Sequence, residues 1–400
     1  MSSNSEKPVL SNATIRLFAF ACGAVIANIY YSQPLLATIA LSFGHPPAHL
    51  GFLVTLTQLG YACGLFLIVP LGDVVDRRKL IVRLLLASTL ALFAVAASTN
   101  FPIFVLANLC VGLTTCAAQL LVPFAASLAP DEDRGRVVGT VMSGLLLGIL
   151  LARTVSGAIA QLSHWRMVYC VAALSMLLLA GVLSRALPDD GRDVQLRYSA
   201  LMASLWSLVR SHPVLRLRSL YGALVFACFS VLWTGLTMLL SQPPYGFSEG
   251  KIGLFGLAGA AGAWAANQAG RLADRGHGNL AAGLFAGTVL ISFALIAGGS
   301  HSLIALLLGI LLLDVGVQGL HISNQSAIYA LAHHARSRIT TVYLTSYFIG
   351  GALGSGAASI AYAASGWYGV CLVGAAFAGL LVALWLATFA LQRPTAPEAS

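Results

Sequence analysis

Two ionisable side chains interrupt the apolar runs of this 400-residue sequence, and they carry opposite charges. Asp314 is the only one of 13 acidic residues that lies deep within an apolar run, and Arg153 is its only basic counterpart. At the centre of a membrane helix, each such charge costs about 2.5–3.5 kcal/mol. Residues kept at that cost predict a functional site, because a buried acid beside a buried cation can exchange protons or bind a charged solute.

The depth of the two charges favours a common site. At about 1.5 Å per residue, Arg153 lies about 14 Å and Asp314 about 17 Å from the same end of their predicted helices. In the leading hypothesis, Asp314 is a proton-coupling carboxylate at which protonation competes with solute binding. Two alternatives stay open: a permanent salt bridge that only fixes packing, and direct binding of an anionic substrate group by Arg153.

Further polar residues follow Asp314 at helical spacing. Gln318, His321 and Gln325 share one face of the predicted helix with it. A polar stripe on a membrane helix is expected to face a cavity or another helix rather than lipid. His321 titrates near neutral pH, and it is either a proton relay to Asp314 or a hydrogen-bonded packing residue.

Other polar residues at membrane depth are candidates for a substrate cavity. Each of them either touches the substrate or makes a hydrogen bond between helices, and the first three precede Pro34, which is expected to kink its helix. These candidates are Asn28, Tyr31, Gln33, Gln119, Trp233, Thr237, Gln318 and Asn324.

Composition requires that lipid surrounds the elements that carry these residues. Charged residues make up 9% of the sequence, against about 25% in an average soluble protein. Apolar residues make up 58%, and the mean hydropathy is +0.86. A soluble domain of this length has no way to hide so much apolar surface, so we expect an all-α membrane protein.

Twelve segments are long and apolar enough to cross a bilayer, which takes about 20 residues. We expect an N-terminal six-helix bundle (1–187), a cytoplasmic linker (188–218) and a C-terminal six-helix bundle (219–400). The linker is either a helix on the membrane surface or a plain tether. The expected spans are 14–41, 48–71, 80–98, 101–128, 137–162, 165–187, 219–241, 249–272, 280–298, 303–330, 339–364 and 367–391.

The basic residues orient the chain and do not indicate a nucleic-acid partner. Nearly all of the 22 Lys and Arg residues fall in segments that share one side of the membrane. Arg166 and Lys251 fall on the other side, and Arg153 lies within an apolar run. This positive-inside pattern predicts a multi-pass protein of the bacterial cytoplasmic (inner) membrane with both termini in the cytoplasm.

Other classes of chemistry have no support in the sequence. The seven Cys residues lie within apolar segments without metal-ligand spacing, so we expect neither a metal site nor a cofactor. There is no phosphate-binding loop of an ATP-driven pump, and no catalytic triad or output domain supports a membrane-embedded enzyme or a sensor.

The two halves of the chain show signs of an internal repeat. Residues 72–77 and 270–275 share a Gly-x-x-x-Asp-Arg pattern after the second and eighth spans. Small residues also recur every fourth position on the fifth and eleventh spans, and such stripes allow close helix packing. The stripes are Gly144, Gly148, Ala152, Ser156 and Ala160, and then Ser346, Gly350, Gly354 and Ala358.

These features resemble the major facilitator superfamily over nearly the whole chain. Its loop signature after the second helix is Gly-x-x-x-Asp-Arg followed by basic residues; here Arg78 and Lys79 follow Arg77 without the usual intervening Gly. The resemblance implies two six-helix pseudo-repeats, a monomer, and a cytoplasmic gate that closes when the protein faces outward. A solvated basic loop that only orients the chain is the alternative. The gate residues would be Gly72, Asp73, Asp76, Arg77, Arg78, Asp274 and Arg275.

A narrower resemblance concerns the efflux permeases of that superfamily. Residues 28–34 and 314–318 are similar to the branch of drug:proton antiporters and of arabinose- and purine-nucleoside-efflux proteins. Asn108 stands where drug antiporters carry an Arg, and Ala152 and Arg153 stand where they carry Gly-Pro. The resemblance implies proton-coupled efflux of a small organic solute by alternating access, with the solute, protons and the lipid bilayer as partners. An uptake symporter or a facilitator is the alternative.

Overall fold

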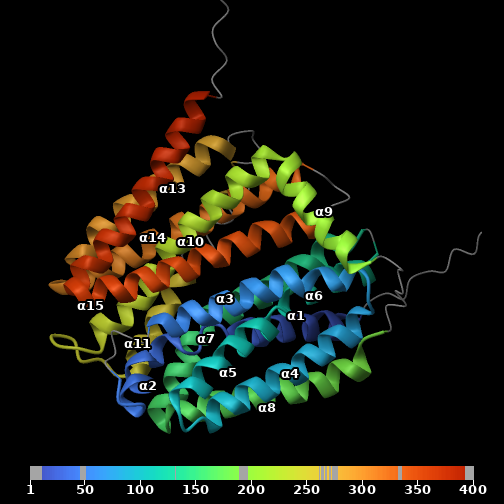
Figure 1. Cartoon of the computed structure of the whole chain (residues 1–400), viewed down its shortest axis with the longest axis horizontal. Coiled ribbons are helices and arrows are strands. Elements are labelled where there is room, and N and C mark those ends of the chain that lie inside the picture. Colours follow the sequence, from blue (N-terminus) through green and yellow to red (C-terminus); the bar gives the residue numbers. More distant parts are fainter. Residues whose placement is uncertain are drawn as a thin grey trace, which may run out of the picture.

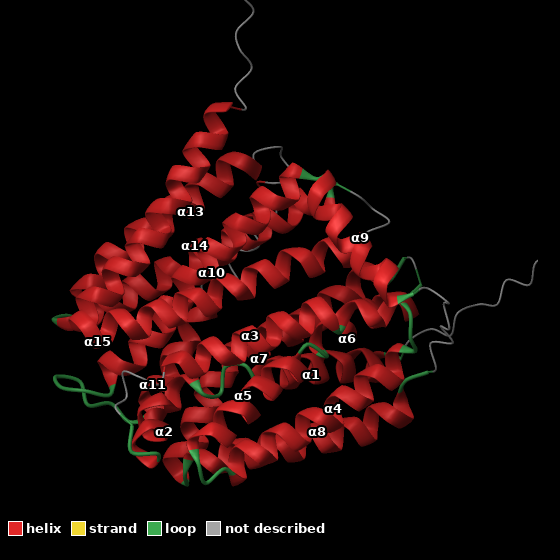
Figure 2. Cartoon of the chain, in the orientation of Figure 1, coloured by secondary structure: helices red, strands yellow, loops and turns green. Residues whose placement is uncertain are grey.

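The computed structural model describes residues 11–45, 51–130, 132–188, 197–260, 262, 265, 268–269, 272, 278–331 and 336–391. Every regular element in these ranges is a helix, as Figure 2 shows. Nine segments of the described chain have the length and apolarity to cross a membrane. The protein is therefore an all-helical membrane protein, as the composition predicts.

The helices before the linker lie together in the lower part of Figure 1 and match the first six predicted spans. Three of these spans are divided by short breaks. The elements are α1 (Asn12–Ala27), η1 (Gln33–Leu35), α2 (Leu36–Ser42), α3 (Gly51–Leu67), η3 (Val69–Asp73), α4 (Arg77–Ala97), α5 (Phe101–Thr115), α6 (Ala118–Leu128), α7 (Arg134–Leu162) and α8 (Trp165–Ala186).

Most of the later helices form the upper group in Figure 1, while α11 lies beside α2; α9 lies on the opposite side of the molecule. These elements are α9 (Tyr198–Ser211), α10 (Pro213–Leu240), α11 (Glu249–Leu254), η4 (Phe255–Gly259), α13 (Gly278–Ala297), η5 (Gly298–Ser300), α14 (Leu303–Tyr329) and α15 (Arg336–Leu391).

Twelve predicted spans correspond to nine continuous ones in the described chain for three different reasons. The first span is interrupted between α1 and α2, where Pro34 lies in η1 as the kink prediction requires. The 56 residues of α15 are two helices joined at Gly366, whose φ of +60° is unfavourable for any other residue. The eighth span is described only in part after η4.

Local capping explains where α4 begins. The Asp76 side chain accepts a hydrogen bond of 2.9 Å from the Lys79 backbone N–H, so α4 begins at Arg77, three residues before the predicted start.

The linker contains a helix, α9, which buries Leu201 and Leu205 on one face. Its position on the membrane surface stays a prediction. The division into domains at 188–218 stays a prediction.

The two small-residue stripes bring backbones together in equivalent pairs of helices. On α7, a Cβ at Gly144 or Gly148 would overlap the carbonyl oxygen of Ala19 or Gly23 on α1. On α15, Gly350 and Gly354 meet the carbonyl oxygens of Ala223 and Ala227 on α10 in the same way. Without water in the bilayer core, such close packing holds helices together. The two stripes that indicated a repeat in the sequence therefore make the same kind of close backbone contact, once in each half of the chain.

Polar contacts join the two groups of helices at several depths. Thr38 of α2 donates to the Glu249 carboxylate at the start of α11. Thr154 of α7 donates to the Gly253 carbonyl at 3.0 Å. Deeper in the molecule, Gln58 of α3 donates to Ser230 of α10 at 3.1 Å. The first two bonds hold the groups together on the side of α2 and α11, and the third joins them in the interior.

The close approach of α7 to α1 generates a stability prediction. Gly148→Ala places a Cβ against the Gly23 backbone and is expected to destabilise the protein by about 1–3 kcal/mol. Gly139→Ala, on the same helix with open space around it, is expected to stabilise the helix by up to about 1 kcal/mol. Thermal melting in detergent measures both, and equal shifts for the two variants would contradict the packing argument.

Candidate functional site

A cavity of about 430 Å³ lies between α7, α10, η4 and α14. Its wall is mostly apolar, with a few polar groups, as is usual for small-molecule sites. The residues that line it are Ser143, Leu146, Leu147, Ile149, Leu150, Arg153, Phe229, Trp233, Gly256, Gly259, Ala260, Asp314 and Gln318. Arg153 and Asp314, predicted to lie at similar depth, therefore share one cavity.

Arg153 is 3% exposed and is held by an amide and by aromatic rings. Its Nε donates to the Gln33 Oε1 atom at 2.6 Å. Its guanidinium carbon lies 4.0 Å from the centre of the Trp233 ring and 4.8 Å from that of Tyr30. Ring faces attract a desolvated guanidinium by about 2 kcal/mol. The Nη2 atom has no hydrogen-bond partner, so one donor of the group stays unused.

Asp314 is 2% exposed, and its Oδ2 atom has no hydrogen-bond partner. In the described part of the chain, no ion pair within 4.0 Å joins it to Arg153. The two residues nevertheless line the same cavity, so their opposite charges attract each other across it. An unsatisfied buried carboxylate is costly, so its presence in the cavity wall marks it as a candidate for binding or proton exchange.

A row of glycines on α11 and η4 makes room for both charged side chains. Gly253 and Gly256 approach Arg153, and an ideal Cβ at Gly259 would lie 3.8 Å from the Asp314 Oδ2 atom. In the 3₁₀ helix η4, residues three apart lie on one line, so Gly256 and Gly259 present a bare face to α7 and α14. The sequence contains this signal as Gly at every third position from 250 to 262, and sequence reasoning missed it.

The polar stripe of α14 faces two cavities. Asp314 and Gln318 line the cavity described above. His321 and Gln325 line a second cavity of about 320 Å³, which Gln119 of α6 also lines. The expectation that this stripe avoids lipid is therefore met. The Nδ1 atom of His321 lies 3.0 Å from the Tyr343 hydroxyl, which fits the packing alternative for this residue.

The other predicted cavity residues are divided between the site and the packing around it. Gln33 positions Arg153, and its carbonyl accepts a bond of 2.8 Å from the Thr237 hydroxyl. Asn324 is buried away from the cavity and accepts from Arg218 at 3.4 Å. Asn28 is buried, and Tyr31 is half-buried; neither lines either cavity.

Two residues near the cavity were not predicted. Tyr30 and Phe229 contribute ring faces to Arg153, and Phe229 also lines the cavity. Tyr30 lies inside the polar stretch singled out on the first helix, so its position was visible but its role was not. No local pattern marks Phe229, because its ring on α10 meets Arg153 of α7 only in the folded chain.

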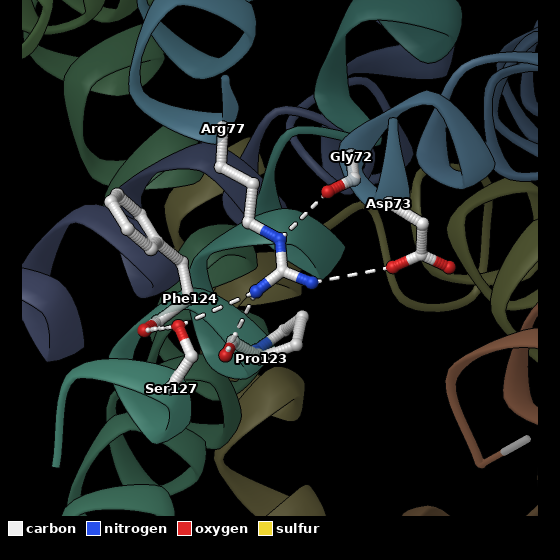
Figure 3. A network of polar contacts seen from close by, with 6 residues as sticks. All are labelled: Gly72, Asp73, Arg77, Pro123, Phe124 and Ser127. Carbon is white, nitrogen blue, oxygen red and sulfur yellow. Dashed lines mark hydrogen bonds and ion pairs between the residues drawn. The ribbon is translucent and has the colours of Figure 1, made fainter. Parts of the chain in front are cut away.

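The loop motif after η3 forms a compact network around Arg77, shown in Figure 3. Arg77 donates to the Gly72 carbonyl at 2.8 Å and pairs with Asp73 at 3.3 Å. Its other amino group reaches the Pro123 carbonyl and the Ser127 hydroxyl of α6. Arg77 is buried, so the alternative of a fully solvated loop is wrong for this residue.

The other residues of the two motif copies either have partners nearby or lie outside the residues that the structure describes. Asp76 caps α4 instead of pairing with Arg77, and Arg78 donates to the Ser184 carbonyl near the end of α8. The motif thus links the ends of several helices in the first half of the chain. The second copy, with Asp274 and Arg275, lies outside the described residues.

Helices packed around a cavity at mid-depth, with polar groups from both halves of the chain, have the architecture of a membrane transporter. A family model for the Major Facilitator Superfamily matches residues 18–355. The chain belongs to the major facilitator superfamily, and it is a multi-pass secondary transporter of a small solute and not an enzyme.

Relatives and a solved structure agree with this assignment. The chain is 48% identical to "Uncharacterized transporter YgaY" of Escherichia coli O157:H7, covering 96% of this chain and 98% of the relative. It is 26% identical to "Probable sugar efflux transporter" of Helicobacter pylori (strain ATCC 700392 / 26695), covering 94% and 95%. A bacterial homolog of the human lysosomal transporter Spinster, solved in an inward-facing and occupied conformation, has the same fold: the TM-score is 0.75 at 14% identity, covering 94% and 96%.

The glycine face predicts how the cavity can be closed by substitution. Gly259→Leu places a side chain between Leu150 and Asp314 and is expected to reduce solute binding at least about tenfold by filling the cavity. Gly287→Leu, on α13 with open space around it, is the matched control and is expected to bind as the natural protein does. Equilibrium binding in detergent tests this, and normal binding by Gly259→Leu would contradict the placement of the site.

The Arg77 network predicts a difference between two arginines. Arg77→Ala removes a buried guanidinium with several acceptors and is expected to cost about 1.5–3 kcal/mol of stability. Arg136 pairs with Asp133 at the surface, so Arg136→Ala is expected to have little effect. The two melting temperatures in detergent test this; a drop for Arg136→Ala as large as that for Arg77→Ala would refute it.

Proposed function

We propose that this chain is a proton-coupled exporter of a small organic solute that works by alternating access. The observation that carries the proposal is Asp314, a buried carboxylate without a hydrogen bond in the described chain, in the wall of a cavity that also contains Arg153. A carboxylate in this position is neutral when protonated and negative when it binds a cationic group, so it couples the two events.

Coupling requires that a proton and the solute compete for Asp314. With the cavity open to the outside, Asp314 takes up a proton and releases the solute. With the cavity open to the cytoplasm, the solute displaces the proton. Arg153 lines the same cavity without an ion pair to Asp314 in the described chain, and its Nε atom is occupied by the bond to Gln33. The pair is therefore poised to change protonation during the cycle.

Two further facts support export. The Helicobacter pylori relative carries the name of a sugar efflux transporter. The stretches 28–34 and 314–318 are similar to the efflux permeases, and both contribute residues next to the cavity, Tyr30 and Gln33 in the first and Asp314 and Gln318 in the second. An uptake symporter has the same need for a protonatable acid, so the direction of transport is decided by the test.

The surrounding residues have supporting roles in this proposal. Trp233 and Gln318 line the substrate cavity, while Gln33 and Thr237 support Arg153. His321 packs in the second cavity, on the path between Asp314 and the gate. The Arg77 network forms the gate on the cytoplasmic side. The positive-inside pattern supports cytoplasmic termini, and the bacterial relatives support the inner membrane; we propose that the protein acts as a monomer.

The test uses proteoliposomes loaded with a panel of solutes. For the natural protein, acidifying the outside is expected to accelerate release of the transported solute, because protons entering on Asp314 exchange for it. Asp314→Asn is expected to abolish this acceleration while exchange at equal pH persists. Asp133→Asn, which changes a surface acid, is the matched control and is expected to retain the acceleration.

The same assay contains the outcomes that contradict the proposal. Transport by Asp314→Asn with an unchanged dependence on pH would remove Asp314 from the coupling. Acceleration of uptake, rather than release, by an outside-acid gradient would establish a symporter instead.

A further inference from the structure

The cavity holds two opposite charges that do not neutralise each other. Arg153 and Asp314 both line it, and both are buried. Neither is paired with the other within 4.0 Å, and each retains an atom without a hydrogen-bond partner, Nη2 of Arg153 and Oδ2 of Asp314. A buried charge without a partner is costly, so a molecule that satisfies both groups binds where one that satisfies a single group does not.

The glycine face lies beside both charged side chains. The Cβ and Cδ atoms of Arg153 pack at Gly256, and the Asp314 Oδ2 atom lies at Gly259. These glycines are one turn of η4 apart, which corresponds to about 6 Å at about 2.0 Å per residue. In the described chain the two charged groups form no ion pair within 4.0 Å, so there is room between them for a small group that carries an ammonium and a carboxylate on one carbon, with a hydrogen bond at each end.

The guanidinium is also prevented from moving toward Asp314. Its Nε bonds to Gln33, and the Trp233 and Tyr30 rings lie against its faces. These partners fix the orientation of the planar guanidinium, and a guanidinium in a fixed orientation is well suited to bind a carboxylate. The cavity therefore offers a binding site for a carboxylate next to one for an ammonium group.

The remainder of the cavity is suited to an apolar group. Leu146, Leu147 and Leu150 form its wall along α7, and the glycines opposite contribute no side chains. Its volume of about 430 Å³ is near the lower end of the range of about 300–1,000 Å³ for small-molecule sites. The site therefore has room for a short apolar side chain attached to the charged pair.

We infer that this transporter carries a small zwitterion of the α-amino-acid type with an apolar side chain. Its carboxylate binds Arg153, its ammonium group binds Asp314, and its side chain lies against the leucines of α7. The inference rests on the proposed function: the ammonium group displaces the proton of Asp314. Besides the bound ammonium group, the ionisable groups in the surroundings of Asp314 are those of Arg153 on α7 and Tyr347 on α15.

Other classes of solute fit the charges less well. An anion without an amine satisfies Arg153 and is repelled by ionised Asp314, and a cation without a carboxylate has the opposite defect. An uncharged sugar leaves both charges without partners of opposite sign. Polar sites reject analogues that leave their buried groups unpaired far more strongly than apolar pockets reject a missing methylene.

The experiment measures counterflow by the full chain in proteoliposomes with a matched set of probes. L-leucine is compared with 4-methylpentanoate, which lacks its amine, with 3-methylbutylamine, which lacks its carboxylate, and with L-arabinose. Leucine is expected to exchange at least about tenfold faster than each of the other three. L-methionine and L-phenylalanine are included as further apolar zwitterions.

A variant tests whether Asp314 binds the ammonium group of the solute. Asp314→Asn removes the negative charge, so it is expected to slow leucine exchange and to raise the rate for 4-methylpentanoate relative to leucine by about tenfold. A change in this ratio cannot come from loss of folded protein, which lowers both rates together. Ser292→Ala, a buried hydroxyl that bonds within its own helix, is the control and is expected to leave the ratio unchanged.

The outcomes separate this inference from the proposed function. If none of the three amino acids exchanges, or if the acid, the amine or arabinose exchanges as fast as leucine, the zwitterion assignment is wrong. Should arabinose exchange and respond to a pH gradient, proton-coupled export survives without the zwitterion. Leucine exchange that ignores a pH gradient would support the zwitterion and remove proton coupling.

Discussion

The buried guanidinium of Arg153 is stabilised without a carboxylate. This constraint decides which charged groups in the cavity remain available. In a medium without water, a cation needs partners, and here an amide oxygen and aromatic ring faces supply them. Asp314 is thereby left in the same cavity as a charge that attracts it without pairing with it. In the proposed function, this arrangement keeps an acid in reach of a solute, whereas a direct salt bridge would occupy both groups.

Glycine spacing on two scales makes this arrangement possible. Glycines every fourth residue on α7 and α15 allow these helices to pack against α1 and α10, which fixes the frame of each half. Gly256 and Gly259 are three residues apart, follow the 3₁₀ geometry of η4 and leave space beside the Arg153 and Asp314 side chains. The first set brings helix backbones into contact. The second set leaves space beside Arg153 and Asp314, so the lack of side chains at these glycines shapes the cavity.

The α14 stripe connects the site with the rest of the molecule. Its residues line first one cavity and then the other, from Asp314 to Gln325. Some bonds between the two helix groups, such as Thr38 to Glu249, lie beside α2 and α11, on the side opposite α9. In the proposed function, the stripe offers a proton and a solute a polar path along one helix.

The sequence by itself determined the membrane class, nearly all helix positions, the repeat, and the similar depth of Arg153 and Asp314. These follow from local periodicity and length, because lipid demands long apolar helices and charges within them are conspicuous. Only the tertiary structure shows that Gln33 and Trp233 hold Arg153 and that Asn324 accepts from Arg218. Such contacts depend on the rotation and tilt of helices distant in sequence, and no local pattern fixes those.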